Sequence, residues 1–362
     1  MKATINPQAL LKELKKMSLV VKKNHIIPIT SAALFSFDKD KLTVTGTDLE
    51  TTCVSSLECK CDEVFSFAID YFDISDVFGS ILDSTTIERK GKEIIIKSGK
   101  AKFNLPITGE VEHFPTTPED DFVFDMEVDG DFFYHLSHAN TCRSKDETRV
   151  SFNMAAIRVF KDHYDVVGID GWQMYKKRFD QKSAKEFCVM VPNSFVSQCK
   201  LFQETKLSFG SRYIKAEFRD DVIISRLSEN TYVNLNSILP AEVDYNITFD
   251  KSDLRNNLNI VSVAAMKSSK QFSVKFKDGE VKLMSKDIDF GKEAEAIIYV
   301  QHSVGIPEIC LNSSSLLHLT SLIDTDEVDM AFTTEDKTVY MKPSGDDSVL
   351  ISIQPLVIIN QN

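Results

Sequence analysis

The amino-acid sequence predicts an α+β fold built from three similar units, each with two helices packed on an antiparallel sheet. The first observation is a strand–turn–strand pattern that ends at an aspartate and occurs three times. The three copies are residues 37–50, 160–172 and 276–291. Their aspartates, Asp48, Asp170 and Asp287, lie about 120 residues apart, and a pattern that recurs at a near-constant interval indicates an internal repeat.

The second observation is that helix-like segments flank each copy at similar distances. Residues 7–21 place leucine and methionine side chains on one face and lysines off that face, which is typical of an amphipathic helix. Residues 131–142 and 252–266 precede the second and third copies at equivalent offsets. After each hairpin comes a strand-like run, a polar helix start such as Asn312, and apolar residues at helical spacing.

The repeat predicts where the chain divides. Two more strand-like runs close each unit, so that one unit reads helix, hairpin, helix and strands. Three such units fill the 362 residues, and 43% hydrophobic residues suffice for three modest cores. We therefore predict domains at residues 1–121, 122–244 and 245–362.

The composition favours a reduced, intracellular protein. No apolar run approaches the ~18–20 residues of a membrane span. The first residues lack the apolar core of a secretory signal, which predicts a cytoplasmic location. Seven scattered cysteines fit free thiols better than a disulfide framework. Cys59 and Cys61 form the one close pair, and no nearby ligands complete a zinc site, so we expect no metal.

The charge is unevenly distributed. The net charge of −12 argues against nucleic-acid binding by the whole surface. Residues 7–23, however, contain five lysines and one glutamate, while acidic residues collect elsewhere, as in residues 119–121 and 324–329. The lysines fit either a basic surface or the solvated face of an ordinary amphipathic helix.

Catalytic patterns are missing from the sequence. It contains no phosphate-binding loop, dinucleotide fingerprint, nucleophile elbow or metalloprotease motif. The charged loop at residues 143–149 lacks a partner nucleophile, so a hydrolase is a poor interpretation. The three repeated aspartates are interpreted as turn residues that accept backbone N–H bonds. Trp172, the single tryptophan, fits a core position or the floor of a groove.

The order of these segments resembles the bacterial DNA sliding clamp family, the beta subunit of DNA polymerase III. The resemblance covers the whole chain. It depends on residues 27–50 and 113–118 in the first unit, on residues 146–160, 166–172, 190–195 and 237–242 in the second, and on residues 311–323 and 351–358 in the third. It implies a non-catalytic processivity factor without cofactors, whose clamp-type domains close as a homodimer into a six-domain ring around duplex DNA. The implied partners are the replicative DNA polymerase, the clamp loader and other proteins that carry a clamp-binding motif of the Gln-Leu-x-Leu-Phe type.

The resemblance also implies positions for the binding sites. Basic residues that would face DNA in the ring are Lys12, Lys15, Lys16, Lys22, Lys23, Arg143, Lys145, Lys200, Arg255, Lys267 and Lys270. A pocket for partner peptides would comprise Arg149, Phe152, Ile169, Gly171, Trp172, Gln173, Met174, Pro240, Asn312, Ser315, Thr338, Ile353, Gln354, Pro355, Leu356, Val357 and Ile358. The dimer contact would pair Phe103 and Leu105 with the segment from Val263 to Met266.

The chain departs from the family at the implied peptide pocket. Trp172 and Gln173 stand where the family commonly has histidine and arginine, and four residues follow Ile358, where many members stop. Pro355 and Leu356 also fit a terminal strand within their own sheet. The alternative function is an interaction scaffold with the same fold, or a specialised clamp that does not serve the main replicase.

Overall fold

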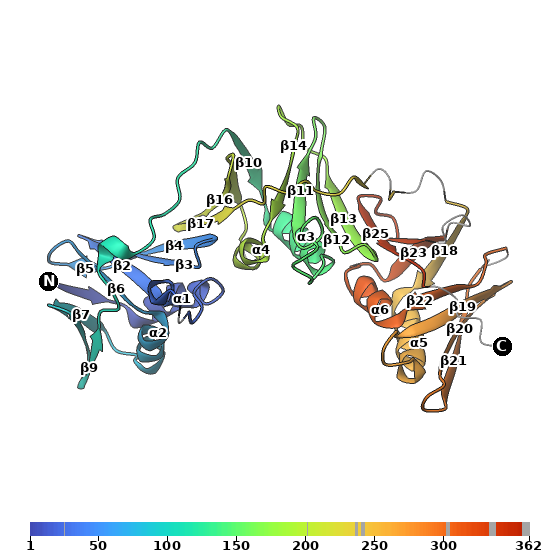
Figure 1. The fold of residues 1–362 in the computed structure, drawn as a ribbon, viewed down its shortest axis with the longest axis horizontal. Coiled ribbons are helices and arrows are strands. Elements are labelled where there is room, and N and C mark those ends of the chain that lie inside the picture. Colours follow the sequence, from blue (N-terminus) through green and yellow to red (C-terminus); the bar gives the residue numbers. More distant parts are fainter. Residues whose placement is uncertain are drawn as a thin grey trace. The chain divides into compact units, whose positions relative to one another are not determined.

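The computed structural model describes residues 1–24, 26–200, 202–235, 238–239, 243–301, 305–332 and 338–356. Two compact units are formed by Met1–Ser137 with Val191–Glu229 (unit 1), and by His138–Met190 with Asn230–Asn362 (unit 2). The described residues contain six α-helices: α1 (Pro7–Met17), α2 (Tyr71–Ser80), α3 (Gly130–Thr141), α4 (Asn193–Cys199), α5 (Lys251–Ala264) and α6 (Ser313–Ser321) (Figure 1). The chain is therefore α+β, as predicted.

Unit 1 holds two antiparallel sheets. The order of the five-stranded sheet is β5 (Lys60–Cys61), β1 (Lys2–Ile5), β7 (Thr85–Lys90), β8 (Glu93–Ser98) and β9 (Ala101–Pro106). The order of the eight-stranded sheet is β10 (Phe124–Val128), β15 (Thr205–Phe209), β16 (Tyr213–Phe218), β17 (Asp221–Arg226), β4 (Thr51–Glu58), β3 (Lys41–Thr47), β2 (Ala32–Asp38) and β6 (Phe65–Asp70).

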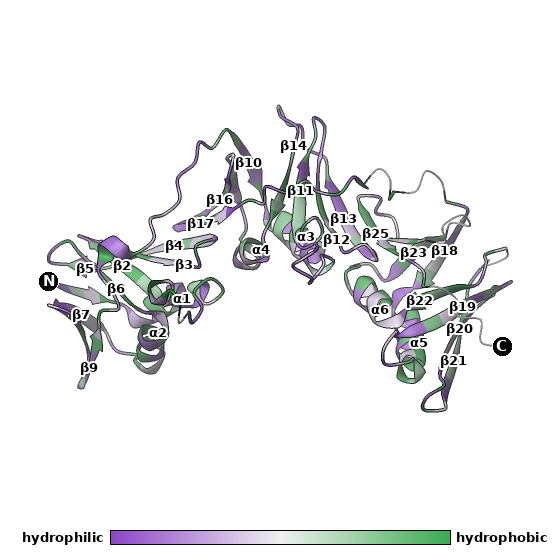
Figure 2. Ribbon diagram, viewed as in Figure 1, coloured by the Kyte–Doolittle hydropathy of each residue, from purple (hydrophilic) through white to green (hydrophobic). Residues whose placement is uncertain are grey.

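Unit 2 repeats this arrangement. The order of its eight-stranded sheet is β14 (Phe187–Val191), β11 (Ala155–Val159), β12 (Tyr164–Ile169), β13 (Gln173–Phe179), β25 (Val349–Ile353), β24 (Val339–Pro343), β23 (Glu327–Phe332) and β18 (Tyr245–Asp250). The order of its four-stranded sheet is β21 (Lys292–Tyr299), β20 (Glu280–Asp287), β19 (Gln271–Lys277) and β22 (Ile309–Asn312). In Figure 2, α5 carries both hydrophobic and hydrophilic positions, as a helix with one face on a sheet should.

Each eight-stranded sheet joins strands from two predicted domains. In unit 1, β4 pairs with β17 in an antiparallel register from Asp221↔Ser55 to Ser225↔Thr51. In unit 2, β13 pairs with β25 from Gln173↔Ile353 to Lys177↔Val349. These pairings use strand edges that would otherwise be open to other chains. The three-domain division itself stays a prediction.

The helix starts follow the capping rules. The Asn6 side chain accepts hydrogen bonds from the backbone N–H groups of Gln8 and Ala9 at the start of α1. Asn312 caps α6 in the same way, which confirms the predicted helix start. Helix α1 ends at Met17, earlier than the predicted segment, because Val20 and Val21 bond back to the Met17 carbonyl in a buried turn.

A small residue two positions before each repeated aspartate lets a strand cross a helix closely. At Gly168 on β12, an added Cβ would lie 1.6 Å from the Ala139 carbonyl oxygen of α3. At Gly46 on β3, it would lie 2.6 Å from a methyl group of Val21, in the turn after α1, and 3.3 Å from Sδ of Met17 on α1. In the third sequence repeat the equivalent residue is Ser285, whose hydroxyl donates to the Val261 carbonyl of α5.

Candidate functional site

The three repeated aspartates shape the turns that end the hairpins. Oδ1 of Asp48 accepts from the N–H groups of Glu50 and Thr51, at 3.1 and 2.7 Å. Oδ1 of Asp170 accepts from Trp172 and Gln173, both at 2.8 Å. Asp287 accepts from Phe290 at 3.3 Å. The predicted turn role is confirmed, and the second turn fixes the backbone at the implied peptide pocket.

An apolar cluster lies beneath this second turn in unit 2. Ile169 on β12 faces Met174 on β13, and both belong to a buried cluster with Ala156, Met190 and Tyr232. Half-buried apolar side chains pack against that cluster and reach the surface: Phe152, Met154, Val233, Ile238, Leu239 and Leu350. Met174 is fully buried, so it supports this apolar surface from below and does not line it.

Phe152 packs against the cluster, and Arg149 and Trp172 lie on the surface near it. The Arg149 guanidinium lies over the Phe152 ring, 4.6 Å from its centroid. Gly171 has a φ of +92°, and a Cβ there would lie 2.7 Å from Nη2 of Arg149, so this glycine gives the guanidinium room. Trp172 is 59% exposed, which rules out the core position that the sequence left open.

The C-terminal strand lies beside this turn. The backbone N–H of Gln354 donates to the Trp172 carbonyl at 2.7 Å, and Thr338 donates to Oε1 of Gln354 at 2.9 Å. Pro355 follows, and Leu356 forms a bridge with Cys310 near the start of α6. Ile353 is buried inside the sheet, so the tail is partly a terminal strand, as one interpretation of the sequence held.

The remaining residues of the implied pocket separate into two groups. Asn312 accepts from the Ser315 backbone and donates to the Ser269 carbonyl, so its side chain is committed to holding α6 in place. Pro240, Val357 and Ile358 lie outside the described residues.

The basic residues implied for DNA binding also separate into two groups. Seven are exposed: Lys12, Lys15, Lys22, Lys23, Lys145, Lys200 and Lys267. Four are half-buried: Lys16, Arg143, Arg255 and Lys270. Nη1 of Arg255 donates to the Leu317 carbonyl at 2.6 Å and to the Thr320 hydroxyl at 3.0 Å, which ties α5 to α6. The exposed lysines are therefore the better candidates for phosphate contacts.

Arg143 is committed to its own loop. Its Nε donates to Oδ1 of Asn140 at 3.0 Å, and its Nη1 donates to the carbonyls of Ser144 and Asn153 at 3.0 and 3.2 Å. Burial lowers the pKa of Arg143 from its ordinary value. These bonds order the loop that carries Arg149, so Arg143 supports the surface around Phe152.

Lys16 belongs to a charged cluster in unit 1. Its ammonium contacts both carboxylate oxygens of Asp221, at 2.9 and 2.8 Å, and a carboxylate oxygen of Glu13. The Ser55 hydroxyl contacts the same two carboxylates. Burial lowers the pKa of Lys16, but the hydrogen bonds with Asp221 and Glu13 raise it more, and the net shift is upward. The cluster fastens α1 to the β4–β17 pairing, a role that the lysine spacing did not reveal.

Two family models match this chain. One describes the N-terminal domain of the DNA polymerase III beta subunit and matches residues 1–118. The other describes the C-terminal domain of the same subunit and matches residues 236–356. The chain belongs to the DNA polymerase III beta subunit family. A clamp of this family is the processivity factor of the polymerase and a non-catalytic subunit, which confirms the predicted function.

Relatives and solved structures match the clamp over nearly its full length. The beta sliding clamp of Pseudomonas aeruginosa is 21% identical, with 98% of this chain and 99% of that protein covered. That of Haemophilus influenzae is 20% identical, with 98% and 100% covered. The crystal structure of DNA polymerase III subunit beta from Pseudomonas aeruginosa has a TM-score of 0.94 at 20% identity, with 99% of this chain and all of that chain covered. The beta subunit from Thermotoga maritima has a TM-score of 0.90 at 18% identity, with 99% of each chain covered. These structures confirm the predicted clamp fold.

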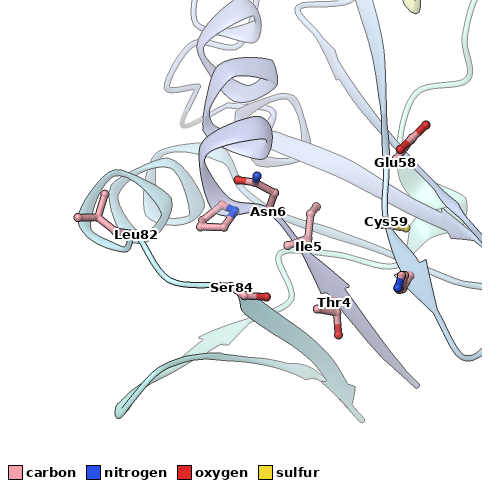
Figure 3. A pocket seen from close by; sticks show the side chains of 9 residues that line it. Thr4, Ile5, Asn6, Glu58, Cys59, Leu82 and Ser84 are labelled. Carbon is pink, nitrogen blue, oxygen red and sulfur yellow. The ribbon is translucent and has the colours of Figure 1, made fainter.

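Unit 1 of the clamp also contains a cavity of about 480 Å³ at the start of α1. Figure 3 shows its walls, which come from β1 and Asn6, from the end of β4 with Cys59, and from Leu82 and Ser84 after α2. Burial, together with Cys61 and Asp40, raises the pKa of the Cys59 thiol to about 11. A thiol that stays protonated near neutral pH is a poor nucleophile. Among the described residues no group of three potential metal ligands occurs, and no helix could cross a membrane.

Proposed function

We propose that two copies of this clamp close head to tail into a cytoplasmic ring around duplex DNA. The observation that carries the proposal is the way the strands are used. The β4–β17 and β13–β25 pairings each complete an eight-stranded sheet. The five-stranded sheet of unit 1 ends at β9, and the four-stranded sheet of unit 2 ends at β21. A third pairing of the same kind, between β9 of one copy and β21 of another, would close the ring.

The faces of these two edge strands are compatible. On β9, Phe103 and Leu105 are half-buried on one side, and Lys102 is exposed on the other. On β21, Ala296 and Ile298 are buried on one side, and glutamates are exposed on the other. Pairing would extend the apolar face from sheet to sheet and place Lys102 near acidic side chains. Val263 on α5 is 76% exposed, as expected of an apolar contact residue, and Met266 follows it half-buried.

Replacing Val263 with glutamate is expected to convert the dimer to a monomer at micromolar concentration. A charge buried in an apolar contact costs free energy that neither copy recovers elsewhere. Sedimentation equilibrium measures the change in mass. Val64→Glu is the matched control, because Val64 is also an exposed valine but follows β5, at the opposite edge of its sheet from β9. A wild-type chain that stays monomeric would instead favour the scaffold function.

We propose that the exposed lysines hold DNA within the ring without reading its sequence. Phosphate attraction is independent of sequence, so a ring that depends on it can slide. The double variant Lys12→Glu/Lys15→Glu is expected to lower DNA affinity about tenfold or more at low salt, by removing and reversing two phosphate contacts. Fluorescence anisotropy with labelled duplex DNA measures this loss. Lys182→Glu/Lys185→Glu, on the loop between β13 and β14, is the control with the same change of charge, and equal losses in the two double variants would contradict the assignment.

The surface formed by Phe152, Trp172 and the half-buried residues of the cluster is proposed to bind peptides of the replicative polymerase, the clamp loader and other partners. It combines apolar contact area with a few polar groups, as peptide-anchor sites do. A rigid turn below it keeps the surface ordered before a partner arrives.

A further inference from the structure

Trp172 is a large aromatic side chain held in solvent by a fixed backbone. Its backbone N–H donates to Oδ1 of Asp170, and its carbonyl accepts from the backbone N–H of Gln354 at 2.7 Å. The residue nevertheless remains 59% exposed. An exposed aromatic ring on an ordered backbone offers contact area at little cost in conformational entropy. The geometry therefore suits the recognition of a flat side chain.

The next residue has an unused hydrogen-bond acceptor. Oε1 of Gln173 is buried and has no partner among the described residues. A buried acceptor without a donor costs free energy, and a ligand that donates to Oε1 when the amide turns toward it would recover this cost. The missing partner must supply a hydrogen-bond donor, and an N–H group is one such donor.

This inference rests on the proposed peptide site. We propose that the peptides this site prefers carry an arginine beside their apolar anchors. The guanidinium would stack on the Trp172 indole and donate a hydrogen bond to Oε1 of Gln173. Arginine fits both requirements because its planar group stacks on aromatic rings and carries donors along its edge. The net charge of −12 on the chain also favours the approach of a basic peptide.

The existing arginine at the site does not occupy this position. Arg149 lies over the Phe152 ring, and its charge also interacts with the Asp146 carboxylate, whose pKa is lowered mainly by hydrogen bonds from Thr148. Trp172 therefore offers a second aromatic surface, beside the Phe152 ring that the Arg149 guanidinium already covers.

Fluorescence anisotropy with three labelled peptides tests the inference on the full-length protein. All share a Gln-Leu-x-Leu-Phe anchor, and the residue flanking it is arginine, citrulline or methionine, with each flank tested in turn. Citrulline keeps the planar shape of arginine and some of its N–H donors, but it has a carbonyl oxygen in place of one nitrogen and carries no charge. We expect the arginine peptide to bind about three- to tenfold more tightly than the methionine peptide. Trp172→Ala and Gln173→Leu should each reduce that ratio, Trp172→Phe should keep part of it, and Gln173→Glu should increase it.

The outcomes separate this inference from the proposed peptide site. If the arginine and methionine peptides bind the wild-type protein equally, the arginine preference is wrong and the peptide site stands. If arginine and citrulline bind equally, the basic character of the partner is wrong. If none of the peptides binds a protein with native circular dichroism, the peptide site itself is overturned, and the inference falls with it.

Discussion

Replacing Gly168 with alanine is expected to lower the stability of unit 2 by about 3 kcal/mol or more, at the upper end of the cost of overpacking. The added Cβ would lie 1.6 Å from the Ala139 carbonyl oxygen, and the neighbouring atoms are backbone. Backbone atoms of a helix do not rotate away as a side chain can, so α3 must move off the sheet. For a domain of this size the loss corresponds to a fall of roughly 6–12 °C in Tm, which calorimetry measures.

Two other glycines provide controls for this experiment. Gly46→Ala is expected to lower the stability less than Gly168→Ala, because its Cβ would meet side-chain atoms of Val21 and Met17, which can adjust. Gly79→Ala adds a methyl group where no atom lies within 4 Å, inside α2. Alanine favours a helix by up to about 1 kcal/mol over glycine, so Gly79→Ala should leave stability unchanged or raise it. A Gly168→Ala protein as stable as the wild type would contradict the close crossing of β12 and α3.

Lys16→Ala is expected to destabilise unit 1 by about 2–3 kcal/mol, the scale of hydrogen bonds to charged groups. Glu13 and Asp221 are only 9% and 6% exposed, and without the ammonium they would be two buried carboxylates with no cation between them. Chemical denaturation measures the loss. Lys15→Ala is the matched control on the same helix, and as an exposed residue its removal should change stability by no more than about 0.5 kcal/mol.

The Lys16 cluster also predicts a pH dependence. Because the pKa of Lys16 is raised above 10.5 in the folded protein, its contribution to stability is complete below that pH and is lost as the pH rises through the folded value. The difference between wild type and Lys16→Ala should therefore shrink in strong alkali. The double variant Lys16→Met/Asp221→Asn should recover part of the lost stability, since it removes one of the two uncompensated carboxylates. If Lys16→Ala is as stable as the wild type, and the double variant is no more stable than Lys16→Ala, the cluster does not contribute to the stability of unit 1.

The sequence predicted the elements that depend on local pattern. Asparagine before an apolar helical run identified the start of α6, and the repeated aspartates identified three turns, because both features act through neighbouring backbone groups. Roles that depend on residues distant in the sequence were not predictable. Lys16 looked like any lysine on a solvated helix face until β17 brought Asp221 beside it.

The same distinction applies to the candidate site. The exposed position of Trp172 follows from the turn at Asp170, and the sequence alone left core and groove equally open. Met174 was expected to line the pocket, yet it is buried within the apolar cluster. The small residues Gly46, Gly168 and Ser285 did carry a readable signal, since each stands two positions before a repeated aspartate. The reason for a small residue at these positions is a close crossing of a strand and a helix, which only the structure shows.

The most direct test of the ring is the retention of the protein on circular and linear DNA. The wild-type chain would be loaded onto nicked circular DNA with a bacterial clamp loader and separated from free protein by gel filtration at moderate salt. We predict that the protein stays with the circle and is lost once a restriction enzyme cuts it, because a sliding ring leaves through a free end. Equal retention on circular and linear DNA would contradict encirclement and show that simple affinity holds the protein.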